Sequence, residues 1–167
     1  MTAHPIEQVL ATLNAGGVRY LVAGGVAVVL HGHLRTTADL DLVVALDPDN
    51  ARRTIQALQS IGFVPRAPVP AAQFADPAAR ARWIADKGLT VFSLWSERVP
   101  GLEVDLFVES PLDFEQAWTR RVEVQLDATS TRVVSLPDLI AMKRAAGRPQ
   151  DLADVEALER LGPGSAT

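Results

Sequence analysis

Two aspartates stand one residue apart in a stretch with the pattern of a β-strand, Asp39-Leu40-Asp41-Leu42. Successive side chains of a strand point to opposite faces, so Asp39 and Asp41 share one face and the leucines share the other. Two neighbouring carboxylates on a packed sheet repel each other and lose hydration, which a cation would offset. Oxygen ligands favour Mg²⁺ or Mn²⁺. The alternative is a solvent-facing edge strand on which both aspartates are merely hydrated.

A second strand candidate, residues 102–108, supplies a third carboxylate. Its even-numbered positions are apolar, whereas Glu103 and Asp105 share the opposite face. Three carboxylates from neighbouring strands suit phosphoryl transfer, in which metal ions lower the pKa of the attacking hydroxyl and neutralise the triphosphate. Asp105 is also placed to act as general base for the acceptor hydroxyl. Glu103 is the less favoured substitute for Asp105.

A glycine pair, Gly24-Gly25, follows a short buried strand candidate and precedes an apolar helix candidate. Without side chains, glycines let backbone N–H groups approach a triphosphate at the positive end of the following helix. Glycine pairs also form ordinary turns after strands. Phosphate binding and a simple turn both remain open for this pair.

Two charged residues fall on the inward stripes of two C-terminal helix candidates. Lys143 follows Leu136 by seven residues, so it either extends along the core to the rim or reaches inward to a phosphate or carboxylate. Asp151 lies among apolar positions of the next helix, although its place in the first turn also suits a helix-dipole role. A Lys143–Asp151 pair would satisfy both positions.

The pattern of the whole chain predicts an α+β fold, in which helices flank a mixed β-sheet and a small helical pair forms the C-terminal end. We expect a core over residues 1–134, the helical pair packed on it over 135–161, and a flexible tail over 162–167. The expected helices cover 6–13, 26–30, 48–61, 78–85, 112–118, 135–146 and 149–161. The expected strands cover 19–23, 39–45, 89–95, 102–108, 122–126 and 131–134, with a proline-rich loop over 65–77.

Composition narrows the classes of function. The 167 residues suit one domain, and 48% hydrophobic with 22% charged residues provide an ordinary globular core. The absence of cysteine excludes disulfides and thiolate metal sites. We expect a cytoplasmic protein without membrane association. The net charge of −4 argues against a broadly nucleic-acid-coating surface, although a local basic patch could involve Arg80, Arg82, Lys87, Arg120 and Arg121.

Four motifs in this order resemble the DNA polymerase β-like nucleotidyltransferases, specifically the minimal and AbiEii-like branches that include toxin–antitoxin components. They are Gly24-Gly25, the stretch from Arg35 to Leu42, Val104-Asp105-Leu106, and Lys143 with the stretch from Arg148 to Asp154. The resemblance implies metal binding by Asp39, Asp41 and Asp105, with catalysis by these residues and Lys143. It also implies nucleotide binding by Gly24, Gly25, Arg35, Thr37, Lys143 and Asp151. Many relatives have Gly-Ser where this chain has Gly-Gly. Structural roles for Arg35, as the partner of an acidic group, and Thr37, as the end of a loop, are equally open.

The resemblance implies a metal-dependent enzyme that moves a nucleoside monophosphate from a nucleoside triphosphate to an acceptor hydroxyl, with Mg²⁺ or Mn²⁺ as cofactor. The expected acceptor is transfer RNA or a partner protein, such as a cognate antitoxin. A small hydroxylated antibiotic is an alternative acceptor, for which the chain is short. A non-catalytic, partner-binding relative is the third reading.

Overall fold

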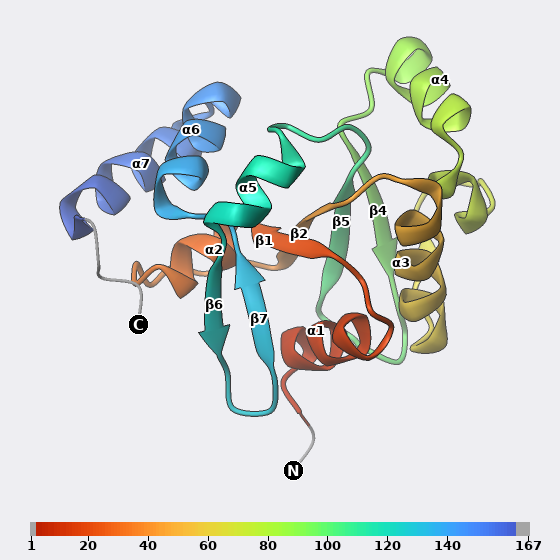
Figure 1. The fold of residues 1–167 in the computed structure, drawn as a ribbon, viewed down its shortest axis with the longest axis horizontal. Coiled ribbons are helices and arrows are strands. Elements are labelled where there is room, and N and C mark those ends of the chain that lie inside the picture. Colours follow the sequence, from red (N-terminus) through yellow and green to blue (C-terminus); the bar gives the residue numbers. More distant parts are fainter. Residues whose placement is uncertain (1–2, 163–167) are drawn as a thin grey trace.

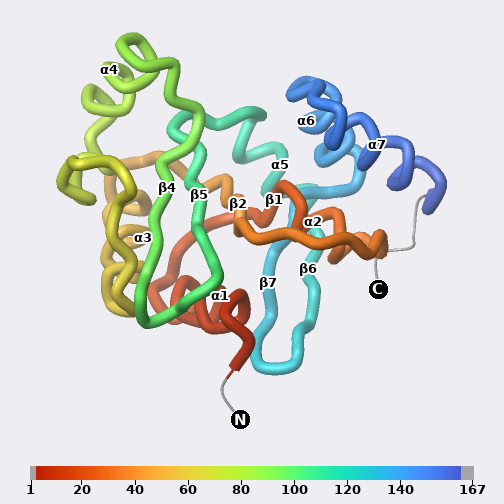
Figure 2. The backbone as a smooth tube through the Cα atoms, turned by 180° about the vertical axis from the view of Figure 1, so that it is seen from behind, coloured from red at the N-terminus to blue at the C-terminus, as the bar shows by residue number. Residues whose placement is uncertain are grey.

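A computed structural model describes residues 3–162, and its central feature is a seven-stranded mixed sheet in the order β3-β4-β5-β2-β1-β7-β6 (Figure 1). The predicted α+β class is confirmed. Helices α3 and α4 lie toward one end of the molecule and α6 and α7 toward the other, as both ribbon and tube show (Figure 2). Of the predicted tail, residues 163–167 lie outside the described part of the chain.

The centre of the sheet is formed by β1 (Tyr20–Ala23), β2 (Asp39–Val44), β5 (Glu103–Phe107) and β4 (Val91–Trp95). β2 pairs antiparallel with β1 and parallel with β5, and β5 pairs antiparallel with β4. β2 is therefore an interior strand, so the edge-strand alternative for the aspartates is wrong. The predicted hairpin of the β4 and β5 segments is confirmed.

Shorter strands extend both sides of this centre. β3 (Val64–Pro65) pairs with β4, and the hairpin of β6 (Val122–Gln125) and β7 (Ser130–Val133) joins the sheet through a parallel contact of β7 with β1. The parallel pairings explain the mixed character of the sheet, because strands close in sequence form hairpins while β2 and β5 meet only after a long crossover.

Most helices begin where the sequence provides a cap. α3 (Pro48–Ser60) starts after Asp47, whose side chain accepts from the Asn50 N–H, with proline at the first position. Ser135 caps α6 in the same way. The remaining helices are α1 (Pro5–Ala15), α2 (Gly24–Leu30), α4 (Pro77–Lys87), α5 (Phe114–Arg120), α6 (Leu136–Ala146) and α7 (Pro149–Leu161).

Several segments differ from the sequence predictions, including the short strand β3, which was not predicted, and β4, which begins two residues later. Two further differences have a clear cause. The proline-rich stretch contains a 3-10 helix, η1 (Ala71–Ala75), because Phe74 is fully buried and stacks on Phe92 with ring centroids 5.6 Å apart. α5 begins two residues later than predicted, since Asp113 accepts from the Gln116 N–H and fixes the start of the helix. Both differences follow from side chains whose role depends on the folded chain.

The two C-terminal helices pack against each other, and α6 also contacts α2. Through α2, this pair approaches the glycine segment and the N-terminal end of β2. The division at residue 134 stays a prediction. In residues 3–162, no helix is long and apolar enough to cross a membrane.

Candidate functional site

The predicted carboxylates come together on neighbouring interior strands. In the parallel register of β2 and β5, Asp41 lies opposite Asp105 and Asp39 lies opposite Glu103. The alternating residues Leu40, Val104 and Leu106 are fully buried on the other face. Asp39 is exposed, whereas Asp41 and Asp105 are partly buried. The sheet therefore places all three predicted carboxylates on one face, at two adjacent levels.

The electrostatics of these carboxylates show that they interact. Burial, followed by the charges of Asp105 and Asp39, raises the pKa of Asp41 from 3.8 to about 6. Positive charges on Lys143 and Arg148 act in the opposite direction, so both cations lie within electrostatic range of Asp41. Burial also raises the pKa of Asp105. This face of the sheet holds negative charge at a cost that a bound cation would relieve.

Gly24 forms the wall of this site next to Asp41. Its φ is +62°, a conformation that favours glycine, and a Cβ atom there would stand 1.9 Å from Oδ2 of Asp41. Any side chain at position 24 would therefore displace the carboxylate or be displaced by it. The glycine is required by the close approach of β2, whichever ligand the segment contacts.

Gly25 is enclosed by Arg35 and Thr37, the two other residues predicted from the glycine and aspartate motifs. A Cβ atom at position 25 would meet Oγ1 of Thr37 at 2.7 Å and an Arg35 guanidinium nitrogen at 2.8 Å. These two polar side chains occupy the space next to Gly25 into which a serine hydroxyl would extend. The hydroxyl of Thr37 also donates to the backbone carbonyl of Asp39 at 3.3 Å, so Thr37 closes the loop before β2.

Lys143 reaches inward and is held by carboxylates of α7. Its side chain is 7% exposed, and Nζ lies 3.3 Å from Asp151 and 2.9 Å from Asp154. The rim position considered for Lys143 is therefore wrong, and the inward position with an Asp151 partner is confirmed. Asp151 also accepts from the Arg148 backbone N–H at 3.2 Å, which satisfies a free donor at the start of α7.

Asp154 connects this lysine to Arg35. Its side chain is 1% exposed and lies 3.1 Å from Arg35 Nε, in addition to Lys143 and a hydrogen bond from Gln150. Burial raises the pKa of Asp154, but hydrogen bonds from Lys143 and Gln150 and the nearby cations outweigh burial and lower it. Asp154 therefore remains ionised and fixes two cations beside the site. Arg35 therefore has an acidic partner, as its structural alternative requires, and its part in nucleotide binding stays a prediction.

Three residues of this region were missed as site residues from the sequence: Asp154, Arg148 and Ser93. Asp154 follows Asp151 by three residues on the same helical face, a spacing that could have identified it. Arg148 belongs to one of the sequence motifs but had no predicted role, although its positive charge lowers the pKa of Asp41. Ser93 lies opposite Asp105 on β4, where its hydroxyl interacts with that carboxylate and partly opposes the rise in its pKa. No local sequence pattern marks Ser93, because the contact depends on strand register.

The donor chemistry of the three carboxylates fits a hard divalent cation. Among the residues that the structure describes, Oδ1 of Asp105 is buried without a hydrogen-bond partner, and the mutual repulsion of Asp39, Asp41 and Asp105 needs positive charge. Their side chains are not already gathered as ligands: within residues 3–162, no group of three or more His, Cys, Asp or Glu residues is arranged to hold an ion. The residues present therefore fit a cation that would draw the carboxylates together.

Comparisons with solved structures agree with this fold. The lincosamide antibiotic adenylyltransferase LnuA, solved with lincomycin bound, is 16% identical with a TM-score of 0.64, covering 97% of this chain and 99% of that one. A putative nucleotidyltransferase from Thermotoga maritima is 13% identical with a TM-score of 0.58, covering 94% and 91%. ANT(2")-Ia in complex with adenylyl-2"-tobramycin is 13% identical with a TM-score of 0.60, covering 96% and 90%. At these identities the likeness establishes the fold.

A search of curated proteins finds no significant match in sequence. A family model described as "Nucleotidyltransferase of unknown function (DUF6036)" matches residues 4–161, nearly the whole chain. The predicted nucleotidyltransferase resemblance is thereby confirmed at the level of the superfamily. The site carboxylates lie on β2 and β5, and Gly24 and Gly25 form the glycine wall of the site. The chain belongs to this DUF6036 family of nucleotidyltransferases.

Proposed function

We propose that the protein is a divalent-metal-dependent enzyme that transfers a nucleoside monophosphate from a nucleoside triphosphate to an acceptor hydroxyl. One observation carries the proposal: Asp41 and Asp105 face each other in register, beside a glycine that leaves no room for a side chain. Two ionised carboxylates at this spacing are costly without a cation, and the rise in the pKa of Asp41 expresses that cost. Membership of the family supports the transfer of a nucleotidyl group.

The proposed reaction assigns metal binding, phosphate binding and charge compensation to different residues. Asp39, Asp41 and Asp105 would hold Mg²⁺ or Mn²⁺, which supplies positive charge to the triphosphate and favours ionisation of the acceptor hydroxyl. Gly24 and Gly25 would lie against the phosphates. Lys143 would offset negative charge on the triphosphate, with its ammonium oriented by Asp151 and by Asp154.

Asp105 is our candidate for the general base. The acceptor oxygen forms a bond to the α-phosphorus while its proton passes to the Asp105 carboxylate. The bond from the α-phosphorus to the oxygen that bridges to the β-phosphorus breaks, and pyrophosphate leaves with that electron pair. Within residues 3–162, Oδ1 of Asp105 has no hydrogen-bond partner, so its acceptor capacity is not already used by the protein.

Two classes of acceptor are candidates for this reaction. The resemblance to toxin–antitoxin relatives favours transfer RNA or a partner protein, such as a cognate antitoxin. A small hydroxylated antibiotic is the second candidate, because a lincosamide adenylyltransferase has the same fold within almost the same length. The length of this chain is therefore compatible with a small-molecule acceptor.

The test is transfer of radioactive label from α-³²P-labelled triphosphates in the presence of Mg²⁺. The acceptors are total transfer RNA, a co-expressed partner protein, tobramycin and lincomycin, each offered separately. We expect label on one acceptor class, abolished by Asp41→Ala and by EDTA. If no acceptor is labelled and the protein also binds no triphosphate with metal, a non-catalytic partner-binding role replaces the proposal.

A further inference from the structure

An open cavity of about 510 Å³ lies directly beside the candidate site and has no part in the proposal so far. Asp39, one of the three predicted metal ligands, contributes to its lining together with Glu103, Trp95, Glu97 and Arg66. Cavities of roughly 300–1,000 Å³ are typical of small-molecule sites. The size alone suits a molecule of a few rings, and the presence of Asp39 connects the cavity to the reacting groups.

The strand order places this cavity on a defined side of the carboxylates. Asp39, Glu103 and Trp95 lie side by side across β2, β5 and β4 in the sheet register. Gly24 lies on the opposite side, because β1 is the other neighbour of β2. The carboxylates therefore separate the glycine wall from the cavity. In a displacement at phosphorus, the attacking oxygen and the leaving pyrophosphate must lie on opposite sides, so a donor against the glycines leaves the cavity for the acceptor.

The charged groups of the cavity indicate what it accepts. Asp39, Glu97 and Glu103 are acidic, and Arg66 is the single cation among the lining residues. Arg66 is already engaged, since it lies 3.2 Å from Glu103 and its guanidinium stands 5.1 Å from the centre of the Trp95 ring. Glu97 therefore remains without a cation from the lining, whereas Asp39 is assigned to the metal ion. The cavity attracts positive charge and repels phosphates.

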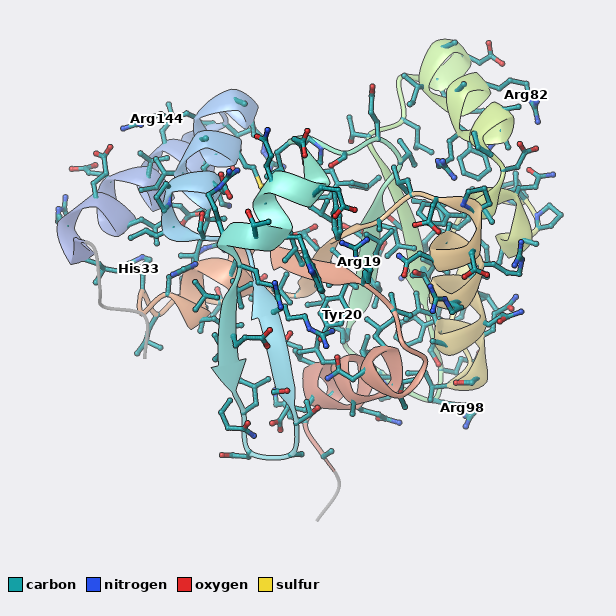
Figure 3. The ribbon with its side chains drawn as sticks, viewed as in Figure 1. Arg19, Tyr20, His33, Arg82, Arg98 and Arg144 are labelled. Carbon is teal, nitrogen blue, oxygen red and sulfur yellow. The ribbon has the colours of Figure 1, made fainter. Side chains whose placement is uncertain are left out.

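Three of the five basic residues considered from the sequence as a local patch are paired or buried. Arg120 is paired with Asp138 and Arg121 with Glu123, and Arg80 is buried with its guanidinium on the Phe74 carbonyl. Arg82, Arg98 and Arg144 lie at separate edges of the molecule (Figure 3). Within residues 3–162, Arg80, Arg120 and Arg121 are therefore paired or buried and do not form a basic patch at this cavity.

From these observations we propose that the cavity is the acceptor subsite and that it takes a small hydroxylated molecule carrying amino groups. This inference rests on the proposed function and names the substrate class of the same site. An ammonium group faces Glu97, the ring system packs on Trp95, and a hydroxyl is presented to Asp105 from the side opposite Gly24.

The test measures binding in the absence of triphosphate and metal, with tobramycin as the amine-bearing probe and total transfer RNA as the polyanion. By titration calorimetry, we expect tobramycin to bind and salt to weaken it. Glu97→Gln should weaken binding roughly threefold to fivefold, and Trp95→Ala roughly tenfold. Glu109→Gln, an exposed acid at the other end of β5 and outside the cavity, is the matched control and should leave the affinity unchanged.

The results separate this inference from the proposed function. Equal affinity for tobramycin in the wild type and Glu97→Gln, no binding of tobramycin at all, or preferential binding of transfer RNA overturns the acceptor assignment. Binding of ATP with Mg²⁺ is measured separately on the wild type. Its absence overturns the proposed transfer reaction whatever the tobramycin result, and its presence with a failed tobramycin test leaves the transfer reaction standing with a different acceptor.

Discussion

Replacement of Asp41 by asparagine should stabilise the metal-free protein while it abolishes transfer. The pKa of Asp41 rises from 3.8 to about 6 through burial and the charges of Asp105 and Asp39. At a pH above 6 the ionised carboxylate is therefore disfavoured in the folded state, by at most about 3 kcal/mol for a difference of this size. Because the position is only partly buried, solvent screening reduces the gain expected from Asp41→Asn to about 1–3 kcal/mol.

The sign of the pH dependence follows from the raised pKa. The unfolded chain releases this proton near pH 3.8, whereas the folded chain keeps it until about pH 6. The wild type therefore loses the contribution of Asp41 as pH rises from about 4 through 6, and the advantage of the variant should be large at pH 8 and small at pH 4.5. Urea unfolding in EDTA at both pH values measures the free energy of unfolding.

Glu109→Gln serves as the control for removal of one negative charge from an exposed position. If Asp41→Asn is no more stable than the wild type at pH 8, or is more stable by the same amount at both pH values, the cost assigned to burying the ionised Asp41 beside Asp105 and Asp39 does not exist. Added Mg²⁺ should stabilise the wild type and not the variant, because only the wild type retains the full ligand set.

Gly24→Ala should lower the free energy of unfolding by roughly 1 kcal/mol or more and should also lower the rate of transfer. The reason is that residue 24 has a positive φ and the new Cβ atom meets Oδ2 of Asp41. An unfolding midpoint and a rate equal to those of the wild type would contradict the close approach. Gly25→Ser should reduce transfer rather than improve it, since Thr37 and Arg35 already fill that space, and an increase in kcat/KM would show that the hydroxyl is accommodated. Asp154→Asn should destabilise the fold by roughly 3 kcal/mol in urea unfolding, because it weakens the pairs of a buried carboxylate with Lys143 and Arg35. Glu156→Gln, exposed on the same helix, is the control. Equal losses of stability in both variants would refute a specific role for Asp154.

Sequence periodicity was sufficient to predict the face of the sheet on which each carboxylate lies. The alternation around Asp41 and around Asp105 predicts which face each occupies, and the structure follows that alternation. It does not predict that the two strands pair in parallel with these residues opposite each other. That register depends on contacts between segments far apart in the chain, which no local window contains.

The ion network of α6 and α7 was partly predictable. The inward position of Lys143 follows from helical spacing, and the pair with Asp151 was anticipated. Asp154 was missed, although it occupies the same face of α7, because a single acidic residue in a helix is more often solvated. The cavity was not predictable, since its lining joins Asp39, Glu103 and Trp95 from three strands whose lateral order only the fold reveals.

The parallel pairing of β2 with β5 also has a consequence for how the protein becomes active. Helix α3, η1, α4 and two strands intervene in the chain before β5 can dock, so this step closes a long loop and is expected to be late in folding. Docking brings Asp41 and Asp105 into repulsion at the same moment. Magnesium present during refolding should therefore favour the final stage of assembly, in which β5 docks. A nascent chain that ends before β5 would have Gly24 and Gly25 but would lack Asp105.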